Sequence, residues 1–244
     1  MFFPIQGNPE FQNVVLQLPM DGAHNSTSFP DKSLPEKTTT PAGGTIISTA
    51  LGFPAALFPL YGTLAVTSHA DFAVGTGDYT LSFRCYLPSL AASYYLIDFR
   101  PAGTNGFYPG VRGDSSGKLY FFWNSADRIS SSAGVLTTAT NHHIAVCRSG
   151  SSTRMFLSGV QVGSTYSDSS SIPQSRILIG GHGYLNIGDY AGYLWDIQYV
   201  RSALYTENFT PPASKSLLTY GSNKFFHKQP LNQPSFLEAA CLGL

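Results

Sequence analysis

The stretch from residue 142 to residue 163 constrains the fold of this chain more than any other. It reads HHIAVCRSGSSTRMFLSGVQVG, with three short apolar runs separated by two turn sequences. The cluster SGSS at 149–152 is typical of a turn. Ser158-Gly159 suits a two-residue hairpin, because Gly adopts the positive φ that such a turn requires. Between the turns the apolar residues recur with a period of two, which indicates strands rather than a helix. The stretch therefore predicts a three-stranded antiparallel meander.

The meander also predicts part of the hydrophobic core. Its first run, 144–147, contains β-branched residues that suit a half-buried pleated surface. We expect the meander to be central in its sheet. Val146 or Cys147, Met155 and Leu157 should then be buried.

Alternation and turn signals predict further strands along the chain. The predicted strands are 13–20, 45–48, 63–68, 78–88, 94–100, 118–124, 176–180 and 193–200. The segment KLYFFWN at 118–124 is apolar on both faces, which favours a central strand covered on both sides. Two prolines in GFPAALFPL, residues 52–60, confine that segment to an edge or a loop. Strands spaced by about 8–12 residues with turns between them are typical of a sandwich or barrel.

Side-chain alternation assigns faces within two of these strands. Leu81, Phe83, Cys85 and Leu87 share one face of the strand at 78–88. In the strand at 193–200, alternation places four residues on one face and Asp196 with Gln198 on the other. The four residues are Tyr193, Trp195, Ile197 and Tyr199.

Composition excludes several classes of protein. Charged residues make up only 11% of the chain and the formal net charge is zero, against a usual charged share of about 25%. This neutrality argues against nucleic acid and anionic membranes as partners. No apolar stretch approaches the roughly 18 residues of a membrane span. The N-terminal sequence MFFPIQGNPEF lacks the features of a signal peptide.

Cysteine usage points to a reducing compartment. Cys85, Cys147 and Cys241 are odd in number and far apart, which fits neither a disulfide framework nor a zinc site. Cys85 and Cys147 lie within apolar strands, so we expect them to be buried thiols. We therefore expect synthesis and folding in a cytoplasm.

Four segments together resemble a domain found in many phage virion proteins, the laminin-G-like, concanavalin A-like jelly roll. They are NVVLQLPMDGAHNSTSFPD, HADFAVGTGDYTLSFRCYLP, HHIAVCRSGSSTRMFLSGVQVGS and AGYLWDIQYVRSALYTENFTPPASKSL. The pieces GTGDYT, AVCRSG and YTENFTPP are individually distinctive. The resemblance implies an all-β fold, a two-sheet antiparallel jelly-roll sandwich. It covers residues 13–218, which leaves an N-terminal arm at 1–12 and a C-terminal arm at 219–244.

The resemblance also implies a function. It favours a non-enzymatic phage virion structural protein, either a capsid decoration or a tail or host-attachment component. Such a protein is located in the virion after synthesis in the host cytoplasm. Its partners would be other virion proteins, further copies of itself and a host surface glycan. A glycan-binding, lectin-like adhesion module is the alternative from another class, and a glycosidase is the third.

Catalytic patterns are weak in this sequence. A glycosidase needs two carboxylates flanking the scissile bond, yet no predicted strand carries two acidic residues two positions apart. The segment Gly113-Asp114-Ser115-Ser116-Gly117 matches G-x-S-x-G. A nucleophile elbow requires a helix after the turn, and here a strand follows, so a hairpin turn is favoured. No enzyme activity and no cofactor are expected.

Several histidines and aspartates are of residue types that can bind metals. His142 and His143 are adjacent on a strand, so they point to opposite faces and cannot hold one metal together. Asp21, Asp189 and Asp196 could join backbone carbonyls around Ca²⁺. Turn-capping aspartates are the alternative.

Aromatic residues supply the candidate contact sites. Rings in Gly-rich loops suit core packing, a subunit contact or stacking on a sugar, and these alternatives stay open. The candidates for glycan or subunit contact are Phe107, Tyr108, Tyr184 and Tyr190. The arms carry apolar anchors and prolines, which suits assembly with neighbouring subunits. The candidate anchors are Phe2, Phe3, Phe11, Phe225, Phe226, Phe236 and Leu237.

Overall fold

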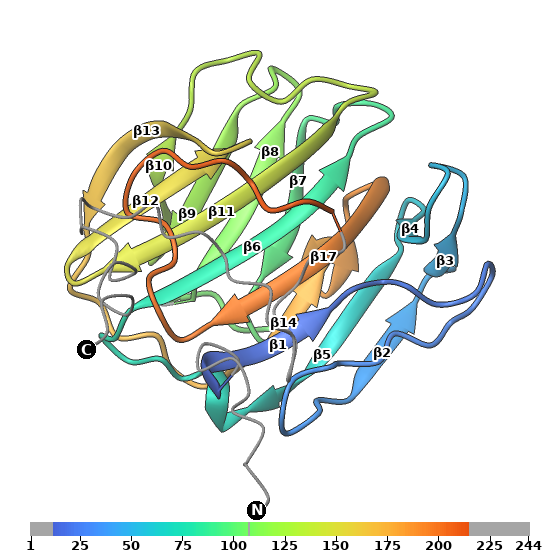
Figure 1. Ribbon diagram of the computed structural model, residues 1–244, viewed down its shortest axis with the longest axis horizontal. Coiled ribbons are helices and arrows are strands. Elements are labelled where there is room, and N and C mark those ends of the chain that lie inside the picture. Colours follow the sequence, from blue (N-terminus) through green and yellow to red (C-terminus); the bar gives the residue numbers. More distant parts are fainter. Residues whose placement is uncertain (1–11, 107, 215–244) are drawn as a thin grey trace, which may run out of the picture.

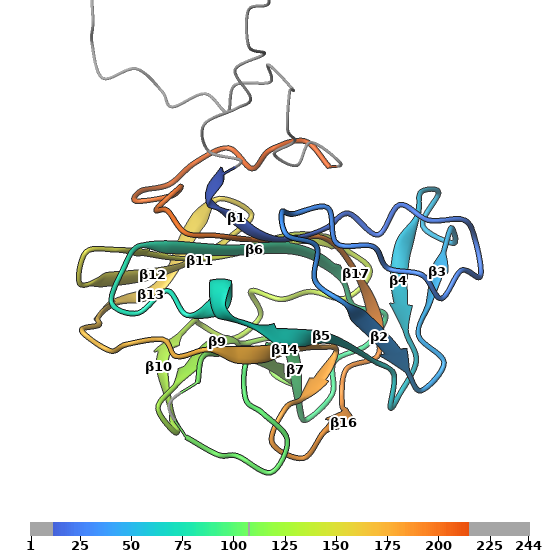
Figure 2. The same cartoon turned by 90° about the horizontal axis from the view of Figure 1, so that it is seen from below.

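The computed structural model of the protein describes residues 12–106 and 108–214. Two antiparallel sheets lie face to face (Figures 1 and 2). The two-sheet jelly roll predicted from the sequence is confirmed. Most of both predicted arms, 1–11 and 219–244, lies outside the described residues.

Sheet A contains eight strands in the order β13-β12-β11-β6-β17-β4-β3, and β1 also pairs with β17. The first and last strands of the fold are therefore neighbours. The bounds are β1 Val14–Leu18, β3 Ile46–Ser48, β4 Ala55–Phe58, β6 Tyr79–Tyr86, β11 Asn141–Ser149, β12 Ser152–Leu157, β13 Val160–Ser167 and β17 Gly192–Val200.

Sheet B contains seven strands in the order β10-β9-β8-β7-β14-β5-β2. Its strands are β2 Thr39–Ala42, β5 Thr63–His69, β7 Ser93–Asp98, β8 Gly110–Asp114, β9 Leu119–Trp123, β10 Ala126–Ser130 and β14 Ser175–Ile179. A separate hairpin of β15 Gly181–His182 and β16 Ile187–Gly188 follows β14. One 3-10 turn, η2, spans Ala70–Phe72. No helix in the described part of the chain is long and apolar enough to cross a membrane.

The predicted meander is β11–β12–β13. Ser158 and Gly159 both have positive φ, at 49° and 85°, as a two-residue hairpin requires. Val146, Cys147 and Met155 are buried as predicted, but Leu157 is only partly buried. The prediction that the whole meander is central is wrong for β13, which forms the largely exposed edge of sheet A.

Strand β17 shows where simple alternation fails. Tyr193 and Trp195 pair with Tyr86 and Arg84, whereas Tyr199 pairs with Leu81, and the register shifts between Trp195 and Gln198. Asp196 has φ 51° and is the extra residue at this bulge. The prediction that Tyr193, Trp195, Ile197 and Tyr199 share one face is therefore wrong, because the bulge turns the first two residues outward.

Two other segments differ from expectation. Strand β4 lies between β3 and β17 rather than at an edge. Its two prolines, Pro54 and Pro59, flank the strand, so they remove no ladder hydrogen bond. Strand β9 is not covered on both sides, because Tyr120 and Phe122 are only half-buried on its outer face.

The closing segment, residues 201–214, covers the outer face of sheet A (Figure 2). Ala145, Cys147 and Phe156 of that face are buried beneath its apolar side chains, including Tyr205 and Phe209. The rings of Tyr205 and Phe209 stack with centroids 3.7 Å apart. The YTENFTPP motif therefore stabilises the fold.

Backbone geometry fixes where the closing segment lies. Phe209 N–H donates to the carbonyl oxygen of Gly159, and a Cβ added at Gly159 would collide with the Phe209 carbonyl. Beyond this contact, Arg84 donates to the Pro212 carbonyl and forms an ion pair with Asp196. The outer face of sheet A is thus occupied by the chain itself over β6, β11, β12 and β17.

Candidate functional site

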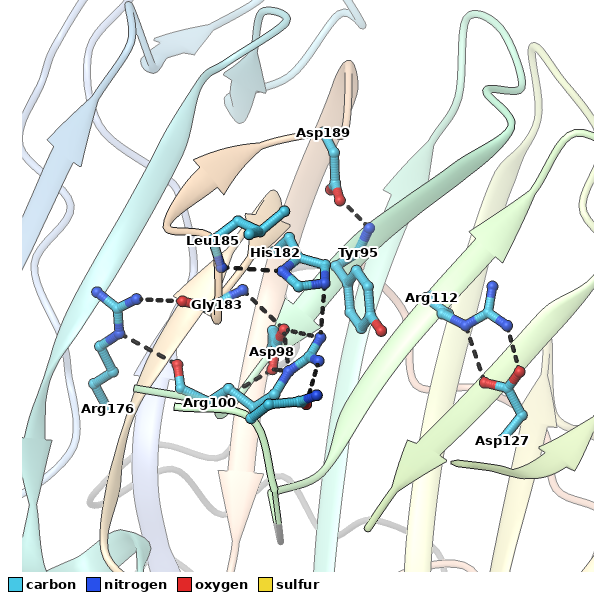
Figure 3. Close-up of polar contacts among 11 residues, drawn as sticks. Tyr95, Asp98, Arg100, Arg112, Asp127, Arg176, His182, Gly183, Leu185 and Asp189 are labelled. Carbon is cyan, nitrogen blue, oxygen red and sulfur yellow. Dashed lines mark hydrogen bonds and ion pairs between the residues drawn. The ribbon is translucent and has the colours of Figure 1, made fainter. Parts of the chain in front are cut away.

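The outer face of sheet B carries a cluster of charged and aromatic side chains (Figure 3). Its centre is an ion pair between Asp98, the last residue of β7, and Arg100. The Arg100 Nη2–Asp98 Oδ2 distance is 2.7 Å, and Arg100 Nε lies 3.1 and 3.0 Å from the two Asp98 oxygens. The side chains of Asp98 and Arg100 are 0% and 3% exposed. A buried ion pair of this kind requires every group to be satisfied.

The hairpin β15–β16 is clamped onto this ion pair. Gly183 N–H donates to Asp98 Oδ2 at 2.8 Å, and Arg176 Nη2 donates to the Gly183 carbonyl at 2.9 Å. A Cβ added at Gly183 would lie 2.5 Å from the Arg100 carbonyl oxygen, so only glycine allows this close approach. Leu185 N–H donates to His182 Nδ1 at 3.2 Å. These contacts fix the tip of the hairpin at 183–186.

The loop after β7 completes the arrangement. Gly103 N–H donates to the Tyr184 carbonyl oxygen at 2.9 Å, so loop 101–106 lies against the hairpin tip. Arg100 Nη1 donates to Asn105 Oδ1 at 3.3 Å, and Nη2 lies 3.4 Å from His182 Nε2. Asn105 and Tyr184 are exposed and His182 is half-buried. The site therefore combines one exposed aromatic ring with polar groups that face solvent.

Aromatic rings flank both arginines of the outer face. The guanidinium carbon of Arg100 is 4.7 Å from the centroids of both Tyr95 and Phe122. That of Arg112 is 4.0 Å from the Tyr120 centroid. Arg112 Nε also donates to Asp127 Oδ1 at 2.9 Å. Both arginines are thus held by a ring and by an aspartate on the same face.

Two titratable groups near the hairpin have shifted pKa values. Burial raises the pKa of Asp189 to about 7, and the charge of Asp98 adds to this effect, although the Tyr95 N–H donated to Asp189 Oδ1 opposes it. Burial and then the charge of Arg100 lower the pKa of His182. His182 is therefore neutral at neutral pH, and its Nδ1 accepts the hydrogen bond from Leu185.

The G-x-S-x-G match is a hairpin turn, as the sequence predicted. Burial opposes ionisation of Asp114, but its carboxylate accepts hydrogen bonds from the Ser116 hydroxyl, the Tyr120 hydroxyl and two backbone N–H groups. These bonds lower the pKa of Asp114 to about 2. The carboxylate therefore stabilises the turn between β8 and β9.

The residues predicted to contact a glycan or subunit differ in how far they are exposed. Tyr184 is exposed at the hairpin tip, whereas Tyr108 is half-buried and packs against the core. Tyr190 is 1% exposed, and its hydroxyl donates to the carbonyls of Tyr86 and Tyr193. The prediction that Tyr190 is a contact residue is wrong, because the ring fills the core. Phe107 and the predicted arm anchors Phe2, Phe3, Phe11, Phe225, Phe226, Phe236 and Leu237 lie outside the described residues.

Two of the three candidate calcium ligands make contacts within the protein. Asp196 pairs with Arg84 and accepts from the Ser214 hydroxyl, while Asp189 accepts from Tyr95. No group of three or more His, Cys, Asp or Glu side chains suited to a metal occurs within residues 12–106 and 108–214. A calcium site built on Asp21, Asp189 and Asp196 gains no support from this arrangement.

The adjacent histidines do point to opposite faces. The ring of His142 contacts Thr137, with Nε2 3.1 Å from the Thr137 backbone nitrogen. His143 lies beneath the closing segment against Tyr205 and Phe209. Burial, with the charge of Arg84 as a second cause, lowers the pKa of His143 to about 3.

No sequence pattern pointed to a site formed by Asp98, Arg100 and His182. They come from two segments about 80 positions apart, and no motif links them. One local signal was present, because an Asp-x-Arg pattern at the end of an apolar strand places two opposite charges where burial demands pairing.

Comparisons with known proteins agree with this fold. The family described as the concanavalin A-like lectin/glucanases superfamily, Laminin_G_3, matches residues 61–208. No curated protein shows significant sequence similarity to the chain.

Solved structures with this fold include binding domains of clostridial toxins. The botulinum neurotoxin type C structure whose title concerns interaction with two ganglioside molecules has a TM-score of 0.59 at 15% identity. The binding domain of Paraclostridial Mosquitocidal Protein 1 has a TM-score of 0.60 at 16% identity. Both matches cover 80% of this chain; the chain spans about half of those proteins, 49% and 50%.

The family match covers more than half of the 244 residues. The chain therefore belongs to the concanavalin A-like lectin/glucanase superfamily, as a member of its laminin-G group.

Proposed function

We propose that this protein is a non-enzymatic virion component of a phage, a capsid decoration or tail-attachment protein, which presents a glycan-binding jelly roll. The virion assignment rests on the resemblance of the GTGDYT, AVCRSG and YTENFTPP segments to phage virion domains. The binding assignment rests on the geometry of the two outer faces. Botulinum neurotoxin structures that concern interaction with gangliosides or a complex with SialylT share the fold, which supports a glycan as the class of ligand.

One observation carries the binding proposal. The closing segment covers the central part of the outer face of sheet A, whereas the outer face of sheet B presents Tyr184 at a tip fixed by hydrogen bonds. Sugar recognition commonly combines an aromatic ring with a few placed polar groups. Tyr184 and the side-chain amide of Asn105, both exposed, provide this combination.

A glycosidase is less well supported by the same face. Asp189, with a pKa raised to about 7, could donate a proton as a general acid does. The neighbouring carboxylate of Asp98, however, is fully buried, and both its oxygens accept hydrogen bonds from Arg100. It is therefore blocked as a nucleophile or base.

Two measurements test the proposed function. Mass spectrometry and immunogold labelling of purified phage particles should find the protein in the virion at fixed stoichiometry. The purified protein should also bind the surface of the host on which the phage grows, and prior digestion of surface polysaccharide should abolish binding. A protein found only in the soluble lysate would contradict the virion role, and binding that survives digestion would contradict the glycan role.

Assembly through the arms is part of this proposal and rests on their sequence. Deleting 219–244 should leave the jelly roll folded but abolish oligomerisation or incorporation into virions. Light scattering and circular dichroism separate these effects. A truncated protein that still assembles, or one that unfolds, would contradict the proposed role of the C-terminal arm in assembly.

A further inference from the structure

Resting on the proposed glycan-binding function, we propose that the ligand is an uncharged glycan. One of its sugar rings stacks on Tyr184, and its hydroxyl groups bond to the side-chain amide of Asn105. The toxin domains of the same fold include one in complex with SialylT, so the fold alone does not select this ligand. The selection follows from how this chain uses its own charges.

The guanidinium groups of all three arginines at the site already donate hydrogen bonds to groups of the protein itself. An acidic sugar is best held by an arginine fork that points two parallel donors at the carboxylate. Arg100 directs Nε and Nη2 at Asp98, and Arg112 directs Nε and Nη2 at Asp127. Arg176 donates to the backbone carbonyls of Arg100 and Gly183. No fork remains directed at a ligand among these three arginines.

The remaining charge near the hairpin is negative. Asp189 lies one residue beyond β16 and ionises at about pH 7, since burial raises its pKa. Its Oδ1 accepts the backbone N–H of Tyr95 at 2.8 Å, and among the described residues no arginine donates a hydrogen bond to its carboxylate. A carboxylated or sulfated sugar would therefore meet a like charge above neutral pH rather than a cation.

The tip itself suits the weakly polar face of a sugar ring. Tyr184 and Leu185 are 39% and 56% exposed. The Tyr184 carbonyl accepts from Gly103, and Leu185 N–H donates to His182. The side-chain oxygen of Asn105, Oδ1, faces Arg100. The side-chain N–H groups of Asn105 therefore point away from that arginine. Because the tip is held in place, little conformational entropy is lost when a ligand stacks on it.

A glycan array probed with the full chain tests the inference. The array should contain matched pairs, each neutral glycan beside its sialylated and its sulfated form. We expect binding to neutral members, at least tenfold weaker binding to their acidic partners, and affinity that changes less than twofold between low and high salt.

Three variants locate the site. Tyr184→Ala should weaken binding about tenfold, and Tyr184→Phe, which keeps the ring, should bind within twofold of the parent protein. Val160→Ala is the matched control, because Val160 is 57% exposed on the edge of sheet A, and it should leave binding unchanged.

The outcomes separate the two proposals. Binding restricted to acidic glycans, or lost in high salt, overturns the uncharged ligand while glycan binding stands. Neutral binding that Tyr184→Ala leaves intact also overturns the inference, because it moves the site elsewhere. Binding to no glycan overturns the proposed function and this inference together.

Discussion

Replacing Asp98 by Asn should destabilise the protein much more than replacing Asp127 by Asn. Both aspartates pair with an arginine on the outer face of sheet B, so the chemistry of the two changes is the same. The side chains differ in burial: Asp98 and Arg100 are 0% and 3% exposed, whereas Asp127 and Arg112 are 28% and 18% exposed. Burial should therefore decide the difference.

The magnitudes follow from that contrast. Removing one partner of a buried ion pair leaves a charge without compensation and costs about 3–5 kcal/mol. An exposed pair contributes about 0.2–1 kcal/mol. Asp98 also accepts the backbone N–H groups of Arg100 and Gly183, and the single amide oxygen of Asn cannot replace both carboxylate oxygens. We expect Asp98→Asn to fall at the upper end of its range.

Urea unfolding measures both changes in free energy. Trp123 and Trp195 are buried, one in each sheet, so their fluorescence reports unfolding of the whole sandwich. The double variant Asp98→Asn/Arg100→Met removes both charges and should regain at least half of the loss. Free energies of unfolding of Asp98→Asn and Asp127→Asn that agree within about 1 kcal/mol would refute the reasoning.

Three further predictions concern pH and packing. Burial lowers the pKa of His143 to about 3. The unfolded chain therefore binds a proton below about pH 6.5 that the folded chain does not, and the free energy of unfolding should fall by about 2 kcal/mol between pH 6.5 and pH 5. His143→Phe should abolish this pH dependence in urea titrations. An unchanged pH dependence in that variant would contradict the assignment. The pKa of Asp189 is raised to about 7, so the folded chain keeps this proton to a higher pH than the unfolded chain does. The free energy of unfolding should therefore decline as pH rises from about 4 to 7. Asp189→Asn should be about 1–2 kcal/mol more stable than the parent protein at pH 8, after allowance for partial exposure, and equal stability at pH 8 would argue against this effect. Met155→Ala should cost about 2–5 kcal/mol and Leu157→Ala clearly less, because Met155 is fully buried and Leu157 is not; thermal or urea unfolding of the two variants would show the reverse order if this packing were wrong.

Local signals predicted much of the fold. The meander was predictable because Ser158-Gly159 admits few backbone conformations and the flanking alternation fixes which side chains are buried. The predicted inner face of the strand at 78–88 is confirmed for the same reason, since Leu81, Phe83, Cys85 and Leu87 are all buried. Such features depend on neighbours along the chain.

Features set by tertiary contacts were not predictable. The bulge at Asp196 depends on Arg84 and Ser214, which lie far along the chain or in the closing segment. Tyr190 sits in a glycine-containing loop, yet it fills the core between the sheets. Alternation and composition describe one strand at a time, and neither contains this information.

The candidate site was only partly predictable. Tyr184 was a candidate contact ring because it lies in a Gly-rich loop, and the structure shows it exposed at the hairpin tip. The network that holds this tip was missed, because Asp98 and Gly183 meet only after β7 and β14 have paired.

The pairing of the first strand with the last has a consequence for how the protein is made. Strand β17 pairs with β1, β4 and β6, so sheet A stays divided until residue 200 has left the ribosome. The contacts that join these strands span long stretches of chain, and such topologies fold slowly, in milliseconds to seconds. Until then the nascent chain exposes the unpaired edges of β1 and β6. Sheet A is therefore completed only when β17 pairs, and a chaperone that shields apolar strands would act before that moment.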